Sequence, residues 1–244
     1  MTYKRNSIWR DEITLWSDVI NKSPDKARPY HNRAFLYQGK GDLDSALSDY
    51  NKAIEIDPGF IFAYNNRPSI CQRQGRFKEA LADYNKAIQI EPRYVLAYNN
   101  RAFIYRKQGE LEKAILDYNN AIKINPNFAL AYHGRARAFQ EQGNLKQALA
   151  DYNKALELDP WSVLCYNSRG SFYRDLGEFD LALADFDKAA EIKPDLAKTY
   201  YNRNFTYFLM HDYNKAQQDL FKAQELGLEV PRGFIEELKK AVSQ

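Results

Sequence analysis

The chain has 244 residues, 45% of them hydrophobic, and its 35 Lys and Arg against 32 Asp and Glu leave a formal net charge of +3. This balance falls well short of the charge excess of a dedicated DNA-binding protein, and the apolar content is too high for a disordered chain. No apolar run approaches the roughly 18 residues of a membrane-spanning helix, and the N-terminus lacks the apolar stretch of a signal peptide. Two cysteines and three histidines predict neither a disulfide framework nor a His-rich metal centre.

An internal repeat with a period of 34 residues organises most of the chain. Proline recurs at this step at Pro58, Pro92, Pro126, Pro160 and Pro194. Alanine recurs at two further places in each repeat. If residue 27 is position 1, the prolines fall at position 32, and six repeats cover 27–60, 61–94, 95–128, 129–162, 163–196 and 197–230. A fixed period of this size indicates a repeat array rather than one conventional core.

Before the repeats, residues 1–26 predict an N-terminal half-repeat with a single helix over about 9–24. In the repeat numbering Trp16 stands at the equivalent of position 24, Val19 at position 27 and Pro24 at position 32. Such a half-repeat would cover one end of the array.

Each repeat predicts two helices. Glycine at position 15, in five of the six repeats, suits a left-handed residue that ends the first helix, and proline at position 32 ends the second. Fourteen of the 18 tyrosines fall at positions 4, 11 or 24, which predicts tyrosines that pack in the core. Pro68, at position 8 of the second repeat, should kink its helix. After the sixth repeat, residues 231–244 predict a C-terminal capping helix.

These positions resemble the tetratricopeptide repeat (TPR). Its pattern is an aromatic residue at 4, a small one at 8, an aromatic one at 11, Ala at 20, an aromatic at 24, Ala at 27 and Pro at 32, and the resemblance covers residues 27–230. It implies an all-α fold, an α-solenoid in which antiparallel helix pairs form a right-handed superhelix with a concave groove. It also implies a protein-binding module without chemistry of its own. We therefore expect no catalytic residue, no cofactor and no metal.

Position 7 departs from the usual pattern, because every repeat has arginine there, and every repeat also has aspartate at position 23. The arginines are Arg33, Arg67, Arg101, Arg135, Arg169 and Arg203, and the aspartates are Asp49, Asp83, Asp117, Asp151, Asp185 and Asp219. Since a partly buried guanidinium needs a partner and a carboxylate can bind it through two hydrogen bonds, we expect six structural Arg–Asp pairs.

The opposite face of the first helix is the candidate binding surface. Position 6 carries Asn32, Asn66, Asn100 and Asn202. Since an amide both donates and accepts hydrogen bonds, this column could bind the backbone of an extended peptide, similar to the asparagine ladder in the TPR domain of O-linked N-acetylglucosamine transferase. Alternatively, the asparagines are solvated residues that the repeat merely copies.

The same face carries a surplus of basic residues. Seven basic candidates against Glu141 and Asp175 give 7 − 2 = +5 on a chain whose total is +3, which favours an acidic peptide or a free carboxylate. The basic candidates are Arg28, Arg73, Arg106, Lys107, Arg137, Arg174 and Lys198. Phe35 and Phe103, with Phe205, could anchor apolar side chains. The alternative is that the long basic side chains only keep the surface solvated.

The sequence therefore favours a non-catalytic adaptor that binds an extended, acidic peptide, in a cytoplasmic location. One alternative is that the chain is the extracytoplasmic tail of a larger membrane-anchored, glycosyltransferase-like protein. Residues 9–34 weakly resemble the segment that joins the membrane domain to the TPR tail in such proteins. Another is a scaffold that associates with itself. RNA binding fits the modest charge less well, and we expect neither nucleic acid as a partner nor membrane insertion of this chain. The TPR clamp for chaperone tails is not supported, because its Lys at position 5 and Asn at position 9 are missing. Cys71 should be a buried hydrophobe, and Cys165 an ordinary thiol.

Overall fold

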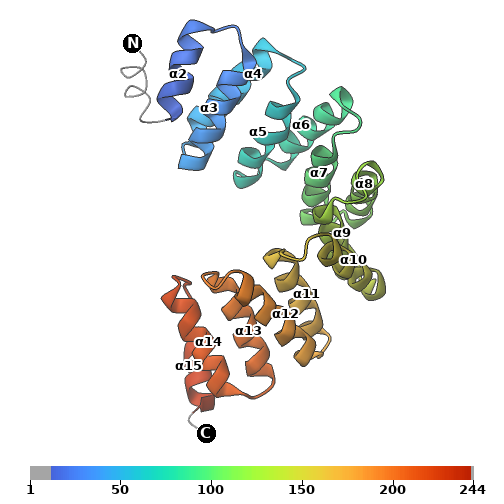
Figure 1. Ribbon diagram of the computed structural model, residues 1–244, viewed down its shortest axis with the longest axis vertical. Coiled ribbons are helices and arrows are strands. Elements are labelled where there is room, and N and C mark those ends of the chain that lie inside the picture. The colour runs from blue at the N-terminus through green and yellow to red at the C-terminus, as the bar shows by residue number, and fades with distance from the viewer. Residues whose placement is uncertain (1–11, 243–244) are drawn as a thin grey trace. The chain divides into compact units, whose positions relative to one another are not determined.

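The computed structural model describes residues 12–242 of the chain. These residues form helices joined by short turns and contain no strand, which confirms the predicted all-α fold (Figure 1). Two compact units divide the chain, one ending at Pro126 and the other beginning at Asn127.

In the first unit a lone helix precedes three helix pairs. The helices are α2 (Glu12–Lys22), α3 (Ala27–Lys40), α4 (Leu43–Ile56), α5 (Ile61–Arg73), α6 (Phe77–Ile90), α7 (Val95–Lys107) and α8 (Leu111–Ile124). In the second unit three pairs precede a lone helix. They are α9 (Ala129–Glu141), α10 (Leu145–Leu158), α11 (Val163–Asp175), α12 (Phe179–Ile192), α13 (Ala197–Leu209), α14 (Tyr213–Glu225) and α15 (Arg232–Val242).

The turn inside each pair forms as the glycine spacing predicts. Gly41, Gly75, Gly109, Gly143 and Gly177 all have φ between 72° and 83°. In the last repeat His211 takes the same conformation at φ 62°, and it is the one non-glycine residue with positive φ in the described part of the chain. A side chain makes this conformation more costly than it is for glycine.

Small and large residues alternate at the contact between the two helices of a pair. The alanines at positions 20 and 27 are at most 1% exposed in every repeat, and the large residue at position 24 is at most 2% exposed. The small side chains let the helix backbones approach each other, and the aromatic ring fills the remaining space. Helix pairs, rather than single helices, are therefore the packed units of the fold.

The tyrosines at position 4 are less buried than the sequence suggested. Tyr30 and Tyr64 are buried, but the other four are only partly covered. Each ring lies instead beside the guanidinium of the arginine three residues later, at 5.4 to 5.9 Å from the ring centroid. The tyrosine at position 4 thus packs its ring against the guanidinium in every repeat.

All six predicted Arg–Asp pairs form, and each is bidentate. In the third repeat Nε of Arg101 donates to Oδ2 of Asp117 at 2.6 Å and Nη2 donates to Oδ1 at 2.7 Å. The remaining nitrogen, Nη1, reaches the second helix of the preceding repeat at Asn85. The same third bond joins Arg33 to Ser17, Arg67 to Asn51, Arg169 to Asn153 and Arg203 to Asp187. One side chain therefore ties together three helices of a unit.

The ends of the described chain follow the repeat geometry. The bond from Arg33 to Ser17 places α2 in the register of a second helix, so Trp16 stands where the sequence predicted. Its ring is only half-buried, because the described residues provide no first helix in front of α2. At the other end Leu238 of α15 is buried, and Phe234 stacks on Phe205 with ring centroids 5.0 Å apart.

Pro68 lies inside α5, which is continuous from Ile61 to Arg73. The helix therefore does not end at Pro68, and the kink expected at this residue stays a prediction. Pro68 is buried at position 8, facing the partner helix, so packing holds the helix together around a residue that cannot donate a backbone hydrogen bond.

Reversing the charge of one paired aspartate should destabilise the fold strongly. Asp117 is 2% exposed, so Asp117→Lys would bury two positive charges beside each other. We expect a loss of at least about 3 to 5 kcal/mol in the free energy of unfolding, measured by urea denaturation. Asp180→Lys, at an exposed site on α12, is the matched control and should cost at most about 1 kcal/mol. Equal effects of the two reversals would show that the pairs do not stabilise the protein.

Candidate functional site

Asparagines at positions 5 and 6 form a hydrogen-bonded ladder across the first helices of the first unit. Nδ2 of Asn66 lies 3.0 Å from Nε2 of His31 in the preceding repeat, and Nδ2 of Asn100 donates to Oδ1 of Asn65 at 3.2 Å. Within one repeat, Nδ2 of Asn65 donates to Oδ1 of Asn66 at 2.9 Å, and Asn99 donates likewise to Asn100. We call these residues, with Asn32, the amide ladder.

The amide ladder changes the meaning of the asparagine column. The sequence predicted that the asparagines at position 6 would either bind a peptide or lie in solvent. In the structure, amides at this position form hydrogen bonds that join one repeat to the next. A carboxamide has two N–H groups and an oxygen with two lone pairs. Asn66 uses one N–H and one lone pair in the bonds above, and its amide also bonds the side chain of Tyr50, so one lone pair of its oxygen remains for a ligand. The asparagines are thus structural ties that retain hydrogen-bonding capacity.

His31 begins the ladder as a neutral imidazole. Its Nδ1 lies 3.1 Å from Oδ1 of Asn32, which can only accept, so Nδ1 carries the proton. Nε2 is then the acceptor that Asn66 needs. Burial lowers the pKa of His31 below its ordinary value, Arg28 lowers it further, and only the bond to Asn32 opposes the shift.

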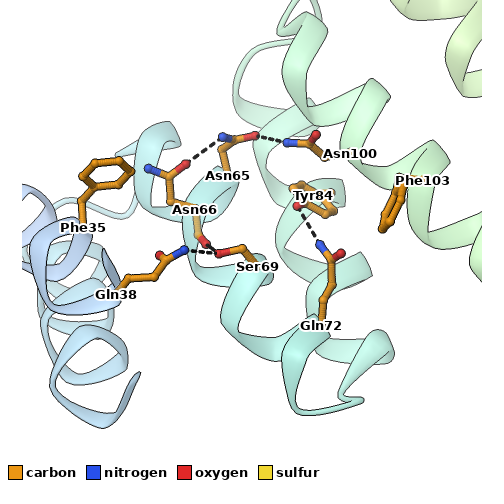
Figure 2. A pocket seen from close by; sticks show the side chains of 9 residues that line it. All are labelled: Phe35, Gln38, Asn65, Asn66, Ser69, Gln72, Tyr84, Asn100 and Phe103. Carbon is orange, nitrogen blue, oxygen red and sulfur yellow. Dashed lines mark hydrogen bonds between the residues drawn. The ribbon is translucent and has the colours of Figure 1, made fainter. Parts of the chain in front are cut away.

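A pocket of about 260 Å³ opens beside this ladder (Figure 2). Phe35 and Phe103 lie at its two sides, and the polar side chains of α3 and α5 line the space between them. We call it the amide pocket; its lining is Phe35, Gln38, Asn65, Asn66, Ser69, Gln72, Tyr84, Asn100 and Phe103. None of these side chains is charged.

The lining of the amide pocket is held in place by its own hydrogen bonds. Nε2 of Gln38 donates to Oγ of Ser69 at 2.8 Å, and Ser69 donates to the carbonyl of Asn66 at 2.6 Å (Figure 2). Nε2 of Gln72 donates to the hydroxyl of Tyr84 at 3.2 Å. Phe35, in contrast, is 59% exposed, and Phe103 is 39% exposed. The pocket therefore combines a fixed polar floor with two apolar side walls open to solvent.

A second, larger pocket of about 610 Å³ lies within the second unit. Arg137, Lys193 and Lys198 line it together with one carboxylate, Asp175. Its apolar lining is Val163, Leu164 and Leu196, and its polar lining includes Asn167, Ser168 and Asn202. We call it the basic pocket.

The ladder continues in the second unit with different residues. Nδ2 of Asn202 donates to Oδ1 of Asn167 at 3.3 Å, and Nε2 of His133 lies 2.9 Å from Oγ of Ser168. Asn167 also donates to Oγ1 of Thr199 at 2.9 Å. The predicted residue Asn202 thus lies on this face and, like Asn66, is tied to the repeat before it.

The predicted basic residues do not form one uniform surface. Arg73 and Lys107 are exposed in the first unit, and Arg137 lines the basic pocket. Arg106 is only 5% exposed, with its guanidinium 5.4 Å from the ring centroid of Phe103, so it is not the free groove cation that the sequence suggested. Arg174 donates to Asp175 at 2.9 Å and covers a phenylalanine ring.

The hydrogen bonds of several polar residues on this face were not predicted from the sequence. His31, Asn65 and Asn99 at position 5 complete the amide ladder, and Gln38 and Gln72 at position 12 line the amide pocket. A signal was present, since position 5 offers a hydrogen-bond acceptor in five consecutive repeats. The pattern alone does not reveal these hydrogen bonds, because each partner lies one whole repeat away in sequence.

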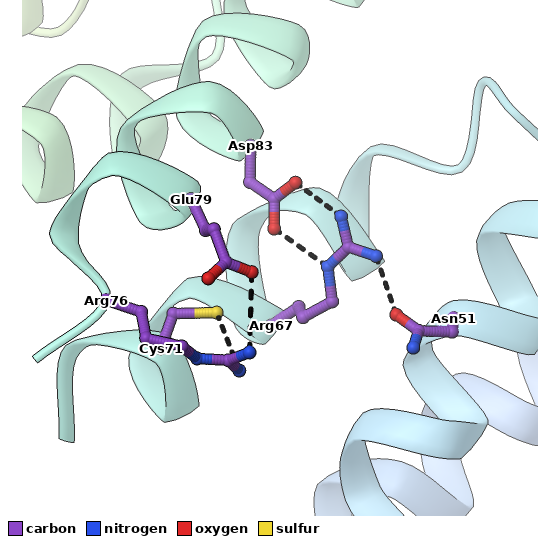
Figure 3. Close-up of polar contacts among 6 residues, drawn as sticks. All are labelled: Asn51, Arg67, Cys71, Arg76, Glu79 and Asp83. Carbon is purple, nitrogen blue, oxygen red and sulfur yellow. Dashed lines mark hydrogen bonds and ion pairs between the residues drawn. The ribbon is translucent and has the colours of Figure 1, made fainter. Parts of the chain in front are cut away.

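The other face of the first helices holds polar groups that are already satisfied. Arg67 binds Asp83 through two hydrogen bonds and Asn51 through a third (Figure 3). The hydrogen bonds to Asp83 raise the pKa of Arg67, against the opposing effect of burial. Beside this pair, the guanidinium of Arg76 lies 3.5 Å from Sγ of Cys71 (Figure 3).

Both cysteines are buried. Cys71 is 2% exposed, and burial raises the pKa of its thiol. Cys165 is 1% exposed rather than the ordinary thiol expected, and burial raises its pKa to about 12. No group of three or more His, Cys, Asp or Glu that could hold a metal ion occurs within residues 12–242. Every described helix is too short or too polar to cross a membrane.

The neutral state of His31 predicts a pH-dependent stability. Because the pKa of His31 is lowered in the folded protein, the unfolded chain takes up a proton first as the pH falls through about 6.5. The free energy of unfolding therefore decreases from that pH downward. His31→Asn keeps an acceptor for Asn66, as Asn65 does in the next repeat. We expect the wild type to lose more stability than this variant between about pH 7.5 and about pH 5 in urea denaturation. Identical losses would contradict the neutral His31 in the ladder.

Tetratricopeptide repeat models match five segments of the chain. One model, described as tetratricopeptide repeat, matches residues 27–60, 129–162 and 163–196, and another, described as TPR repeat, matches 69–109 and 103–143. Among curated proteins, Hsp70-Hsp90 organizing protein 3 of Arabidopsis thaliana is 34% identical over 62 residues. That match covers 23% of this chain and only 11% of the relative, so the chain spans a small part of it.

Solved structures share the fold. A tetratricopeptide repeat protein from Parabacteroides merdae aligns with 94% of this chain and 90% of its own, with a TM-score of 0.74 and 23% identity. A chain from the crystal structure of the APC/C hetero-tetramer Cut9-Hcn1 aligns over 96% of this chain and 46% of its own length, with a TM-score of 0.80 and 17% identity. YrrB, described as a TPR protein with an unusual peptide-binding site, aligns with 74% of this chain and 93% of its own (TM-score 0.54, 25% identity). The family-model matches span more than half of the chain, which therefore belongs to the tetratricopeptide repeat family.

Proposed function

We propose that this chain is a non-catalytic adaptor that binds an extended, acidic peptide of a partner protein on the exposed face of its first helices. The observation that carries the proposal is the amide pocket, in which a floor of side-chain amides lies between two exposed phenylalanines. Membership of a family of protein-interaction modules supports it.

The chemistry of the amide pocket suits a peptide backbone. Each residue of an extended strand offers one N–H donor and one C=O acceptor, and side-chain amides can satisfy both at once. Asn100 keeps a donor and an acceptor beyond the bonds of the ladder, and Asn66 keeps an acceptor. Because the amides recognise groups that every residue has, this contact contributes affinity with little dependence on the ligand sequence.

The exposed phenylalanines supply the apolar part of the contact. Phe35 and Phe103 present large side chains to solvent next to a polar floor, an arrangement typical of binding surfaces rather than of a solvated helix face. The acidic preference rests on the surplus of basic residues, of which Arg73 and Lys107 are exposed in the first unit.

Two relatives support this direction. The structural neighbour YrrB is described as having a peptide-binding site, and Hsp70-Hsp90 organizing protein 3 is named for two partner proteins. We extend only the general mode, binding of a protein segment, to this chain.

Removal of the two aromatic walls should weaken peptide binding without unfolding the protein. We expect Phe35→Ala/Phe103→Ala to reduce the affinity for peptides selected from an array of extended acidic and neutral peptides by at least about tenfold, measured by fluorescence anisotropy. Phe221→Ala, at a phenylalanine that is 49% exposed on α14, is the matched control and should bind as the wild type does. Melting temperatures should stay close to the wild type in all three proteins.

The proposal would be wrong if the array contained no binder, or if the double variant and the control bound with equal affinity. Replacing Asn66 by Ala is a less clean test, because it also removes bonds that tie the first two repeats together. A loss of binding in such a variant therefore supports the proposal only if its free energy of unfolding equals that of the wild type.

A further inference from the structure

The two pockets differ in charge although they lie on the same face of equivalent helices. The amide pocket contains no charged side chain, whereas the basic pocket contains three cations and one carboxylate. Position 9 makes part of this difference, because Phe35 and Phe103 stand there in the first unit and Arg137 in the second. The basic pocket therefore concentrates positive charge in the second unit, in addition to the exposed Arg73 and Lys107 of the first unit.

The cations of the basic pocket are not neutralised by the protein itself. Lys193 and Lys198 are exposed and form no ion pair with any residue that the structure describes. Arg137 approaches Glu141 only at 4.0 Å, and both side chains are about 40% exposed. The single carboxylate of the lining, Asp175, already binds Arg174 at 2.9 Å. The pocket thus keeps a surplus of positive charge.

The backbone adds to this positive field. Lys198 lies in the first turn of α13, whose N-cap residue Leu196 provides no side-chain cap. The N-terminus of a helix carries partial positive charge, so a lysine there is unfavourable for the isolated helix. The helix end and the lysine together favour an anion held between them and the other cations.

An apolar wall adjoins the cations. Val163, Leu164 and Leu196 line the same pocket, and Leu164 is 53% exposed. With a volume of about 610 Å³, the pocket has room for two neighbouring side chains of a ligand. An exposed leucine beside uncompensated cations fits a ligand that brings an apolar group next to its negative charge.

We infer that the basic pocket recognises an Asp or Glu residue that is adjacent in sequence to an apolar residue of the bound peptide. The carboxylate binds among Arg137, Lys193 and Lys198, and the apolar side chain packs against Leu164 and Leu196. This inference rests on the proposed function, and it assigns part of the acidic preference to a defined place in the second unit. The amide pocket, which has no charged side chain, then contacts peptide segments without regard to their charge.

Peptide libraries of about twelve residues, long enough when extended to cross several helices, test this assignment. The central pair is fixed as Glu-Leu, Gln-Leu or Glu-Ser, and the other positions are random. We expect the immobilised wild-type protein to retain Glu-Leu peptides about tenfold more than either comparison library, and the preference over Gln-Leu to fall as salt rises from about 0.05 to about 0.5 M. In Lys193→Gln/Lys198→Gln the preference for Glu-Leu over Gln-Leu should disappear.

Lys146→Gln/Lys239→Gln removes the same charge from exposed sites of the second unit outside the pocket, and it should keep the wild-type preference. If the wild type retains peptides but does not distinguish Glu from Gln, or if the preference survives in Lys193→Gln/Lys198→Gln, the inference is overturned while the proposed binding of an extended peptide stands. Equal retention of Glu-Leu and Glu-Ser peptides would overturn the role of the apolar wall. If no library is retained at all, the proposed function fails and the inference with it.

Discussion

The buried Arg–Asp pair is the interaction on which the rest of this structure depends. Two oppositely charged groups at the contact between two helices are tolerable only when each satisfies the other, and the bidentate geometry does so in every repeat. Since the third nitrogen of the guanidinium reaches the preceding second helix within each unit, the pair fixes both the helix hairpin and its neighbour. In a repeat protein without a single large core, such contacts between neighbouring repeats specify the fold.

This arrangement also decides which surface is free to bind. Six arginines and six aspartates cancel on the side of the first helices that meets the second helices, so they add nothing to the charge that a ligand meets. On the opposite side, the amide ladder ties successive first helices through neutral groups. Neutral ties leave donors and acceptors available, whereas the ion pairs leave almost none. The proposed binding surface thereby lies on the side of the helix opposite the ion pairs.

The sequence predicted the elements of local and periodic origin well. The helix boundaries follow from glycine and proline, and the Arg–Asp pairs follow from two residue types that recur at fixed positions within one hairpin. Contacts that depend on side-chain direction between repeats were harder. Asn66 was predicted on the right face, yet its bond to His31 joins residues 35 apart in sequence. The burial of Arg106 and the pairing of Arg174 with Asp175 likewise depend on local packing that residue type alone does not determine.

The central claim is that the exposed face of the first helices binds ligand while the second helices only support it. Nuclear magnetic resonance with a peptide selected by the array tests this most directly on a chain of 28.5 kDa. We expect the side-chain amide signals of Asn66 and Asn100 and the backbone signals of α5 and α7 to shift on titration, while Ala114 and Ala121 on α8 stay unchanged. Shifts concentrated on α4, α6 and α8, with the amide ladder unaffected, would contradict the account.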